Sequence, residues 1–595
     1  MAIATCCLLL GATLAHAASP KLAKELQGRG SSEPVNVIIQ FHQTPTAAHH
    51  QKVAQRGGTL ARELKLVKAG AYSVPASALA ALADDPEVAY IAPDRPVSGT
   101  AVNNGQTLDY HTAAINAAYG SGLGLDGTGI GVAVIDSGIT NVPDLDKRVV
   151  YSQNFVGAGG GSADDTYGHG IHVSGIIAGS GKNSMGPGYF YKFQGLAPNV
   201  NLINLRVLDQ NGQGRDSQVI AAIQQAIKLK AKYNIRILNL SLGRPVYESY
   251  TLDPLCQAVE QAWNAGIVVV VAAGNEGRNN SANNNGYGTI TAPGNDPYVI
   301  TVGAMRTMGT PDRSDDVIAS YSSKGPTLYD HVVKPDLVAP GNEIISLYAT
   351  PSPGIPALTL ATTYPGDEVS TALYKNGAAS KSTSYFILSG TSMAAPMVSG
   401  AAALMLQQSP ALTPDQVKAR LMKTAYKNLV PFSSATDPTT GVTYQEQADI
   451  FTVGAGYLDI QAALSNRDLA PAVVGSALSP TATQDDQGNI VLVSADPAIW
   501  GTSVMWGNSV TWGTSVLWGT NTLGQSVLWG TSVCWGNSAT QGYSVLWGTA
   551  STLAQSVLWG TTNTLTQSVL WGSSSISAMS SVSGQADSIS VYGEN

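Results

Sequence analysis

The stretch Gly390-Thr391-Ser392-Met393-Ala394-Ala395-Pro396 is followed by an almost unbroken run of small and apolar residues that reaches Met405. Such a run can form a buried helix that begins at the serine, because small side chains permit close packing. The N-terminus of a helix offers backbone N–H groups and a favourable dipole to an anion. A simpler interpretation also fits these residues, in which Ser392 is only the N-cap of the helix.

Short apolar runs alternate with helix-like segments from about residue 107 to residue 465. The runs lie at 131–136, 200–208, 235–240, 267–272 and 299–302, and helix-like segments such as 217–230 and 255–265 separate them. This alternation predicts an α/β fold, with a mainly parallel sheet covered by helices on both faces. Functional residues are then expected near the strand ends and in the loops that follow them.

Three residues elsewhere in the chain could complete a hydrolytic site with Ser392. Asp136 ends an apolar run, His169 opens a stretch that can form a buried helix, and Asn275 follows another apolar run. A carboxylate can orient an imidazole that deprotonates a serine, and an amide can donate to the developing oxyanion. Each of these residues alone also fits an ordinary turn, cap or core position. His172, one helical turn after His169, is expected to make structural hydrogen bonds.

The order of these four residues, and the runs around them, resemble those of the subtilisin-like serine proteases (subtilases). Val134-Ile135-Asp136-Ser137-Gly138 is similar to the aspartate motif of the family, the run 168–175 is similar to its histidine motif, and the serine run matches most fully. The one departure is Ile171, where the family usually has threonine. The resemblance covers roughly residues 34–465, with a catalytic domain at 107–465.

This resemblance implies a role for each residue of the set. Ser392 would be the nucleophile, His169 its base, Asp136 the group that orients His169, and Asn275 an oxyanion donor in an acyl-enzyme mechanism. It also implies substrate-binding residues, which are Gly212, Gln213 and Gly214 on one edge, Ser241, Leu242 and Gly243 on the other, and Ala272, Ala273 and Gly274 as one wall of the first specificity pocket. An extended protein or peptide substrate would add itself between the two edges as a β-strand.

The chemistry implied by the family requires no cofactor, although several subtilases need structural calcium. The Asp and Asn residues of this chain are scattered, and no calcium-binding loop can be assigned, so the metal ligands are unknown. Between residues 341 and 389 the chain is longer than in minimal subtilisins. Residues 350–384 are expected to form a surface insertion near the cleft, which could narrow substrate access or merely decorate the surface.

The region 34–97 has the pattern of a small α/β unit. Val35, Val37, Ile39 and Phe41 place apolar side chains on one face of a predicted strand, a helix-forming stretch covers 77–83, and residues 88–91 form a second strand. The run 79–94 resembles the inhibitory propeptide of subtilases, which would make this unit an inhibitor of its own enzyme. An independent binding domain is the alternative.

The first twenty residues, MAIATCCLLLGATLAHAASP, combine an apolar stretch with an A-x-A pattern and predict a signal peptide at 1–17. No Lys or Arg precedes the apolar stretch, so a short buried helix is the alternative. A signal peptide predicts a secreted or cell-surface protein of the bacterial export type. It would also remove Cys6 and Cys7, and the remaining Cys256 and Cys534 do not form a disulfide framework.

The C-terminal part changes in composition. Residues 469–495 are rich in Ala, Pro and Ser and are expected to be a linker, and residues 496–573 form a tail in which Trp-Gly occurs nine times. A meander or solenoid of very short strands, or a disordered tail, would fit this Trp-Gly tail. Wall anchoring, glycan binding and a role in secretion all stay open for this tail, so a surface or glycan partner is one hypothesis. A nucleic-acid partner is not expected, because phosphate binding needs a basic face, whereas the net charge is −8 and only 12% of residues are charged.

The sequence therefore predicts a secreted serine endopeptidase that is made as a self-processed precursor. Two other hypotheses stay open. In the first, a catalytically idle protein presents the Trp-Gly tail for adhesion, against which the complete set of Asp136, His169, Asn275 and Ser392 argues. In the second, the chain is an acid-active sedolisin, a class that shares a Gly-Thr-Ser run but has acidic residues in place of His169 and Asn275.

Overall fold

The computed structural model describes residues 19–28, 31–98, 110–157, 160–281, 284–349, 358–437, 441–484 and 490–493, with five short strands beyond residue 516. The predicted signal peptide, 1–17, lies outside the described residues. The chain divides into two compact units, and the division falls between Asp94 and Arg95. Residues 95–97, which the sequence places at the end of the propeptide-like region, therefore belong to the second unit.

The first unit is built on an antiparallel four-stranded sheet with the order β2-β3-β1-β4. Its elements are η1 (Lys24–Leu26), β1 (Pro34–Phe41), α1 (Ala47–Gln55), β2 (Thr59–Leu64), η2 (Lys65–Val67), β3 (Ala69–Pro75), η3 (Ala76–Ala78), α2 (Leu79–Ala83) and β4 (Val88–Pro93). Alternate residues of β1, namely Val37, Ile39 and Phe41, are buried in one hydrophobic core together with Leu22 and Leu26. The predicted strands and the helix at 77–83 are confirmed, and the core begins well before residue 34.

The second unit contains the predicted parallel sheet. Its strand order is β13-β12-β11-β10-β6-β8-β7, and β14 pairs with β12. The strands are β6 (Gly131–Asp136), β7 (Val149–Asn154), β8 (Asn201–Arg206), β10 (Ile235–Leu240), β11 (Val268–Ala272), β12 (Ile300–Arg306), β13 (Val317–Ile318) and β14 (Leu337–Pro340). All the pairings are parallel except that of β13 with β12. The mainly parallel α/β sheet predicted from the sequence is thus confirmed.

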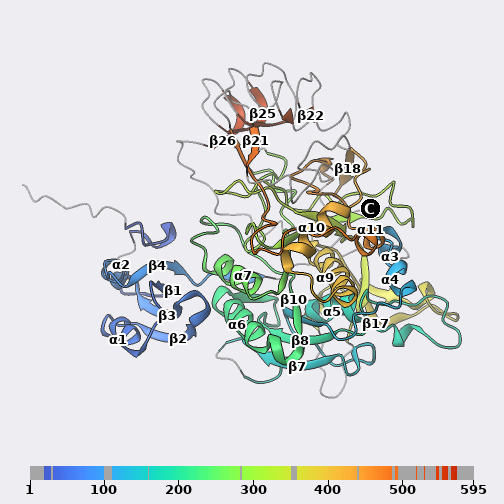
Figure 1. Cartoon of the computed structure of the whole chain (residues 1–595), viewed down its shortest axis with the longest axis horizontal. Helices are drawn as coiled ribbons and strands as arrows, with labels where there is room; N and C mark the ends of the chain where they lie inside the picture. Colours follow the sequence, from blue (N-terminus) through green and yellow to red (C-terminus); the bar gives the residue numbers. More distant parts are fainter. Residues whose placement is uncertain are drawn as a thin grey trace, which may run out of the picture. The chain divides into compact units, whose positions relative to one another are not determined.

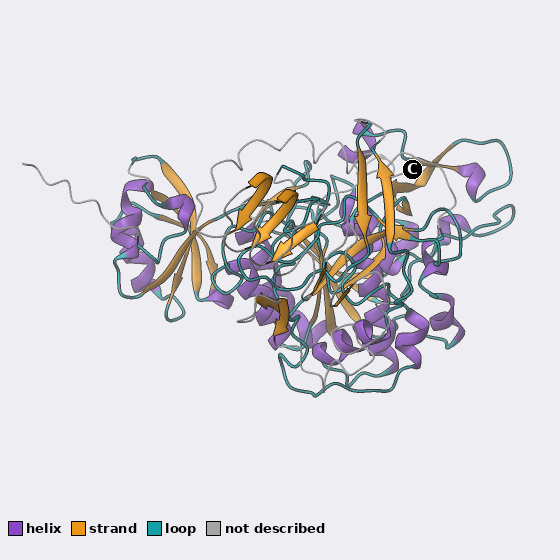
Figure 2. Ribbon diagram, turned by 90° about the horizontal axis from the view of Figure 1, so that it is seen from above, coloured by secondary structure: helices purple, strands orange, loops and turns teal. Residues whose placement is uncertain are grey.

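Helices pack on both faces of this sheet (Figures 1 and 2). They are α5 (His169–Ala178), α6 (Asp216–Tyr233), α7 (Pro254–Asn264), α9 (Thr391–Gln408) and α10 (Pro414–Thr424). Helices α6 and α7 pack against each other, and α5 packs against α9. Every residue of α9 from Thr391 to Leu406 is buried. Because its residues are small or apolar, α9 can lie directly on β10, β11, β12 and β14.

Smaller elements surround this core. They are β5 (Pro96–Ser98), α3 (His111–Ala114), α4 (Ala118–Gly122), η4 (Pro143–Leu145), η5 (Lys182–Ser184), β9 (Gln213–Arg215), β15 (Ile344–Leu347), α8 (Thr359–Thr363), β16 (Glu368–Ser370), η6 (Thr371–Leu373), β17 (Lys381–Leu388), β18 (Phe432–Thr436), β19 (Thr443–Gln447), α11 (Ile460–Ser465), β20 (Thr481–Gln484) and β21 (Ile490–Val493). Strands β15, β17 and β16 form one sheet, while β5 with β9, β18 with β19 and β20 with β21 form two-stranded pairs. Of these pairs, β5 with β9 lies at a predicted substrate-binding edge.

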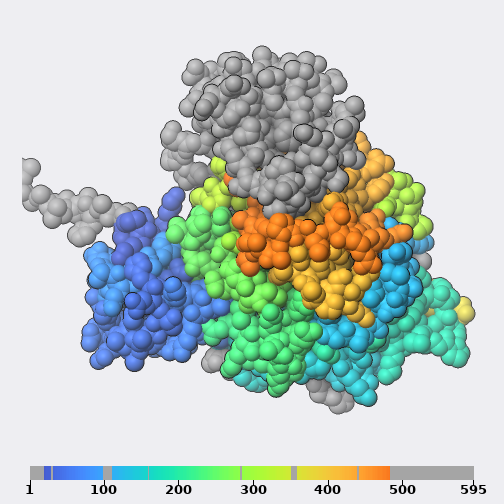
Figure 3. Space-filling view, in the orientation of Figure 1, coloured from blue at the N-terminus to red at the C-terminus, as the bar shows by residue number. Residues whose placement is uncertain are grey.

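Much of the predicted linker is packed against the second unit. In the space-filling view the orange residues that end near 484 lie against the gold residues of the α10 region (Figure 3). The amide of Gln416 donates to the carbonyl of Ala470 at 2.8 Å, and Lys418 Nζ donates to Ser479 Oγ at 2.8 Å. Residues 469–484 therefore continue the fold of the second unit, although their Ala, Pro and Ser content also fits a linker.

Five short strands lie in the Trp-Gly tail. They are β22 (Leu517–Trp518), β23 (Leu528–Trp529), β24 (Ser544–Trp547), β25 (Leu553–Trp559) and β26 (Leu565–Trp571). Strands β24, β25 and β26 pair in parallel, in a register that aligns Trp547, Trp559 and Trp571. The predicted meander or solenoid stays a prediction, because most of this tail lies outside the described residues.

Two further features concern the cysteines and the apolar character of the helices. Cys256 is buried and forms no disulfide, whereas Cys534 lies outside the described residues. Within the described part of the chain, no helix combines the length and the apolar character needed to cross a bilayer.

We predict that Leu404→Ala destabilises the second unit strongly. Leu404 lies in α9 and is 1% exposed, and truncation of a buried leucine costs about 2–5 kcal/mol. The melting temperature should be measured in a Ser392→Ala background, so that proteolysis does not contribute. Leu469→Ala is the matched control, since Leu469 is 62% exposed; equal melting temperatures for the two variants would contradict the central position of α9.

Candidate active site

The structure brings the predicted acid and base into direct contact. Asp136 is the last residue of β6 and His169 is the first residue of α5, and their side chains are 1% and 0% exposed. His169 Nδ1 lies 2.7 Å from Asp136 Oδ1. Because a carboxylate can only accept, Nδ1 carries the proton and donates it, which leaves the lone pair of the neutral ring on Nε2. This is the tautomer that a general base requires.

A second acid, Asp165, organises the loop that precedes His169. Asp165 is fully buried, and its carboxylate accepts from the backbone N–H groups of Gly168 at 2.8 Å and Ile171 at 2.9 Å, and from the hydroxyl of Ser137 at 2.9 Å. Burial raises the pKa of Asp165, although these hydrogen bonds act in the opposite direction. Asp165 was not among the residues predicted from the sequence; the available signal was an acid four residues before His169.

The start of α5 lies too close to the loop after β6 for any residue larger than glycine at position 170. A Cβ atom on Gly170 would come within 2.3 Å of the carbonyl oxygen of Gly138. The Gly170 N–H donates to Ser137 Oγ at 2.8 Å. The segment that follows Asp136 therefore packs closely against the start of α5 and is hydrogen-bonded to it.

His172 is a structural residue, as predicted. Its Nε2–H donates to the carbonyl oxygens of Ile344 at 3.1 Å and Phe386 at 3.2 Å. Burial is the main cause that lowers the pKa of His172 to about 3, and the nearby His169 acts in the same direction. His172 therefore stays neutral at physiological pH and ties α5 to β15 and β17.

Ser392 lies in the first turn of α9 and is 1% exposed. Its hydroxyl donates to the carbonyl oxygen of Ser241 at 3.1 Å, and the hydroxyl of Ser241 donates to the carbonyl oxygen of Ser392 at 2.9 Å. This reciprocal pair joins the start of α9 to the loop after β10. Because α9 also packs against α5, the helices that begin at the predicted nucleophile and base belong to one packed core.

Asn275 is held by the residue that precedes Ser392. Its Oδ1 accepts from the backbone N–H and from the hydroxyl of Thr391, both at 2.9 Å. The Thr391 hydroxyl in turn accepts from the N–H of Gly274 at 3.1 Å. Since the N–H of Thr391 can only donate, the oxygen of the Asn275 amide must face it, and the Nδ2 donor faces away. This places an amide donor beside the N-terminus of α9.

The predicted substrate-binding residues lie where parallel strands end or where a short edge strand begins. Gln213 and Gly214 are in β9, and Gly212 closes the turn before it by donating to the carbonyl of Asp209 at 3.1 Å. Ser241, Leu242 and Gly243 follow β10, whereas Ala272, Ala273 and Gly274 form the end of β11 and the residues after it. Strand β9 pairs antiparallel with β5, with Val97 opposite Gly214.

Part of the predicted surface insertion supports the histidine loop. The N–H groups of Thr359 and Leu360 donate to the carbonyl oxygens of Thr166 and Tyr167 at 3.2 and 3.0 Å. Leu358 is 1% exposed and lies next to Gly168. Residues 358–363 therefore pack against the segment that precedes His169, and they are not a mere surface decoration. The Pro-, Thr- and Ser-rich composition of the insertion gave no signal of this contact.

The structure assigns no metal ligands. Among the described residues, no group of three or more His, Cys, Asp or Glu side chains lies close enough together to hold a metal ion. The sequence analysis left the metal ligands unknown, and the structural calcium that the family resemblance implies stays a prediction.

Comparisons with known proteins give a family match and several named relatives. The model of the subtilase family matches residues 127–456, which is more than half of the chain. The serine protease AprX of Bacillus subtilis (strain 168) is 40% identical over 322 residues, which are 52% of this chain and 65% of that protein, so the chain spans just under two thirds of it. Subtilisin E of the same strain is 32% identical over 409 residues, 68% of this chain and 88% of that protein.

A solved structure shows the same fold. Fervidolysin from Fervidobacterium pennivorans, whose structure is described as that of a keratinolytic enzyme related to subtilisin, aligns with a TM-score of 0.52 and 21% identity. The alignment covers 76% of this chain and 63% of that one. The family match, the coverage of subtilisin E and this common fold lead to one conclusion: the chain belongs to the subtilase family of serine proteases.

Proposed function

We propose that the protein is a secreted serine endopeptidase, made as a precursor that processes itself, and that it cleaves extended protein or peptide substrates. The observation that carries this proposal is the buried hydrogen bond of 2.7 Å between His169 Nδ1 and Asp136. It fixes the imidazole in the tautomer of a base, at the start of a helix that packs against the helix of Ser392.

The first chemical step is the attack of Ser392 on the substrate carbonyl. The Ser392 hydroxyl turns from the carbonyl of Ser241 toward Nε2 of His169, which takes its proton as the oxygen attacks. The carboxylate of Asp136 stabilises the imidazolium that forms. His169 then gives the proton to the leaving amine, and water hydrolyses the acyl-enzyme by the reverse sequence of proton transfers.

The oxyanion of the tetrahedral intermediate is stabilised by donors at the N-terminus of α9. Asn275 Nδ2 and the backbone N–H of Ser392 are the proposed donors, and the dipole of α9 adds a favourable partial charge. The contact of Asn275 Oδ1 with Thr391 orients the amide before any substrate binds. These donors are therefore preorganised, which is the source of their effect on the rate.

Substrate binding is proposed to follow the pairing that β5 makes with β9. The chain from Pro96 to Ser98 runs antiparallel to β9. Position 212 is next to the ring of Tyr167, and that ring lies 6.4 Å from the ring of His169. A strand that follows β5 beyond Ser98 therefore advances toward the proposed catalytic centre, which supports both an extended substrate and a self-cleaved precursor.

The proposals on export, cofactors and partners have separate support. Residues 1–17 have the pattern of a signal peptide, and a relative in Thermus sp. (strain Rt41A), 34% identical over 366 residues, is named an extracellular serine proteinase. The proposed chemistry uses only groups of the chain itself and requires no cofactor, with structural calcium as a further proposal. The first unit is proposed as the inhibitor of the enzyme, and a surface or glycan partner is proposed for the Trp-Gly tail.

We predict that Ser392→Ala abolishes catalysis, because no other group takes the place of the attacking oxygen. The full chain and the variant should be expressed side by side, then compared by gel analysis of the precursor and by digestion of casein. Loss of the nucleophile lowers kcat by about 10⁶-fold in proteases of this mechanism. Casein digestion or precursor cleavage that persists in the purified variant would refute the assignment of Ser392.

We predict that Asn275→Asp lowers kcat by at least about 10²–10³-fold with little change in KM. The new carboxylate keeps the acceptor that holds Thr391 but removes the donor and adds a charge of the same sign as the oxyanion. Steady-state kinetics on a peptide substrate measure this. Asn280→Asp is the matched control at an exposed position; an equal loss in both variants would argue against an oxyanion role.

We predict that the self-processing cut falls between Ser98 and Tyr110. Ser98 is the last residue paired with β9, whereas α3 and the buried Ile115 after it are part of the second unit. N-terminal sequencing of the processed protein locates the cut. A mature chain that begins before Ser98 would show that β5 is a permanent part of the enzyme.

A further inference from the structure

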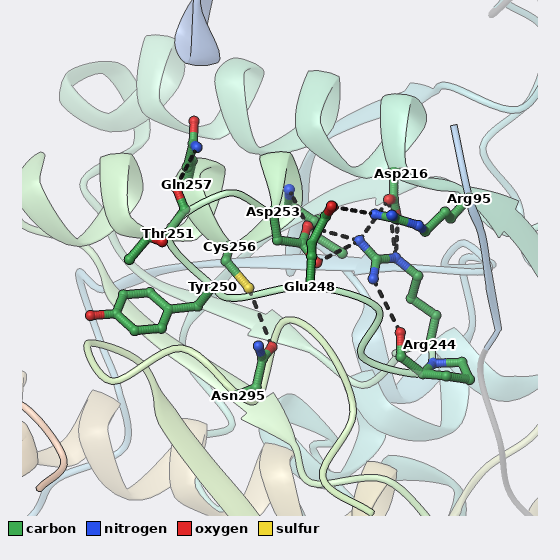
Figure 4. A network of polar contacts seen from close by, with 12 residues as sticks. Arg95, Asp216, Arg244, Glu248, Tyr250, Thr251, Asp253, Cys256, Gln257 and Asn295 are labelled. Carbon is green, nitrogen blue, oxygen red and sulfur yellow. Dashed lines mark hydrogen bonds and ion pairs between the residues drawn. The ribbon is translucent and has the colours of Figure 1, made fainter. Parts of the chain in front are cut away.

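Arg95 lies immediately before β5 and has its side chain buried in the second unit, where it is 3% exposed. Its guanidinium donates to Glu248 Oε1 at 2.6 Å (Figure 4). Its Cζ lies 5.1 Å from the centre of the Tyr247 ring. Glu248 is itself only 7% exposed. Arg95 precedes the expected cut between Ser98 and Tyr110, so burial in an ion pair beside an aromatic ring is unusual for a residue that would leave the processed enzyme.

The residues around Arg95 form an acidic site, which we call the Arg95 site. It consists of Glu248, Tyr247, Arg244, Asp216 and Asp253. Arg244 donates to both carboxylates, at 2.9 Å to Asp216 and at 2.7 Å to Asp253 (Figure 4). The site itself therefore holds three carboxylates and one guanidinium, and the charge of Arg95 offsets one of the two remaining negative charges.

The Arg95 site lies at the outer end of both proposed substrate-binding edges. Asp216 follows β9 directly, and Arg244 follows Gly243 directly. The ion pair of Arg244 with Asp216 therefore ties the two edges together. The backbone of Arg95 joins the same arrangement, because its carbonyl accepts from the N–H of Asp216 at 2.8 Å. A strand between the edges places its preceding residue in this site.

We propose that the Arg95 site is a specificity site that binds an arginine or lysine side chain of the substrate. The inference rests on the proposed function, because it treats the segment from Arg95 to Ser98 as an example of how substrates bind. The preferred substrate carries a basic residue two positions before the residue that pairs with Gly214, as Arg95 stands two positions before Val97.

The charge of the site explains why it would select a basic side chain. Once the segment before the cut departs, the buried Glu248 loses the charge-assisted hydrogen bond from Arg95, and the loss of such a contact from a buried carboxylate is unfavourable. An incoming arginine restores the charge-assisted hydrogen bond, whereas an acidic side chain would meet three carboxylates. The Tyr247 ring favours a guanidinium over an ammonium, because a guanidinium also stacks on aromatic faces.

The kinetic test uses two internally quenched peptides of the sequence 93–106 of this chain, one unchanged and one with Arg95→Gln. We expect the processed enzyme to cleave the unchanged peptide with a kcat/KM about 10- to 100-fold higher, the range that a charge-assisted hydrogen bond supplies. In Glu248→Gln the ratio should fall toward one. Glu368→Gln is the matched control, because Glu368 pairs with Lys381 in a different sheet, and it should keep the ratio.

The outcomes separate this inference from the proposed function. If the wild-type enzyme cleaves both peptides equally well, it is a protease and the specificity site is refuted. If it cleaves neither peptide nor casein, the proposed function fails, and a binding measurement that needs no catalysis decides the inference. That measurement uses the full chain with Ser392→Ala and Arg95→Ala, and the probe is ethylguanidinium at millimolar concentration.

In the binding measurement, ethylguanidinium should raise the melting temperature of the Arg95→Ala chain in a saturable way. The same probe should produce no such rise when Glu248→Gln is added, nor in the Ser392→Ala chain that keeps Arg95. Equal responses of the three chains would overturn the inference, because the Arg95 site would then have no affinity for a cation supplied from outside.

Discussion

Burial of α9 is the constraint on which the rest of the second unit depends. The helix is covered along almost its whole length, and it contacts four strands of the parallel sheet as well as α5. Its first turn holds Thr391 against Asn275 and Ser392 against Ser241. The proposed nucleophile and oxyanion donors are therefore placed by the packing of α9 and by its contacts with the loops that follow β10 and β11.

Buried charged residues also hold the loop before His169 and the two proposed substrate-binding edges in place. Asp136 and Asp165 each accept two or more hydrogen bonds. These bonds offset the cost of burying the two carboxylates, and they hold the loop before His169 in place. Arg244 does the same for the substrate edges, since it joins the residue after β9 to the N-cap of α7 at Asp253. The residues that hold the two edges at a fixed separation are thus also the residues that give the Arg95 site its charge.

The parts of the fold that depend on local pattern could be predicted from the sequence. The apolar runs 131–136 and 235–240 match β6 and β10 residue for residue, and the acid, base and serine were found from their motifs. What the pattern could not show are contacts between distant segments. Asp165, the packing of residues 358–363 beside His169 and the docking of 469–484 on α10 depend on tertiary contacts. An Ala-, Pro- or Ser-rich stretch has the same composition whether it is packed or exposed.

The pairing of β5 with β9 is short, so the contact of Arg95 with Glu248 contributes a large share of the binding of this segment. A neutral hydrogen bond contributes about 0.5–1.5 kcal/mol, so a ladder of three paired residues provides only a few kcal/mol. A hydrogen bond to a charged group contributes about 1.5–3 kcal/mol, so the contact of Arg95 with Glu248 is comparable to a large part of the ladder. A segment that binds through both contacts would leave slowly after the proposed self-processing cut. Arg95 would therefore oppose rapid release of the cut segment. A basic side chain at the corresponding position of another protein would favour the selection of that protein as a substrate.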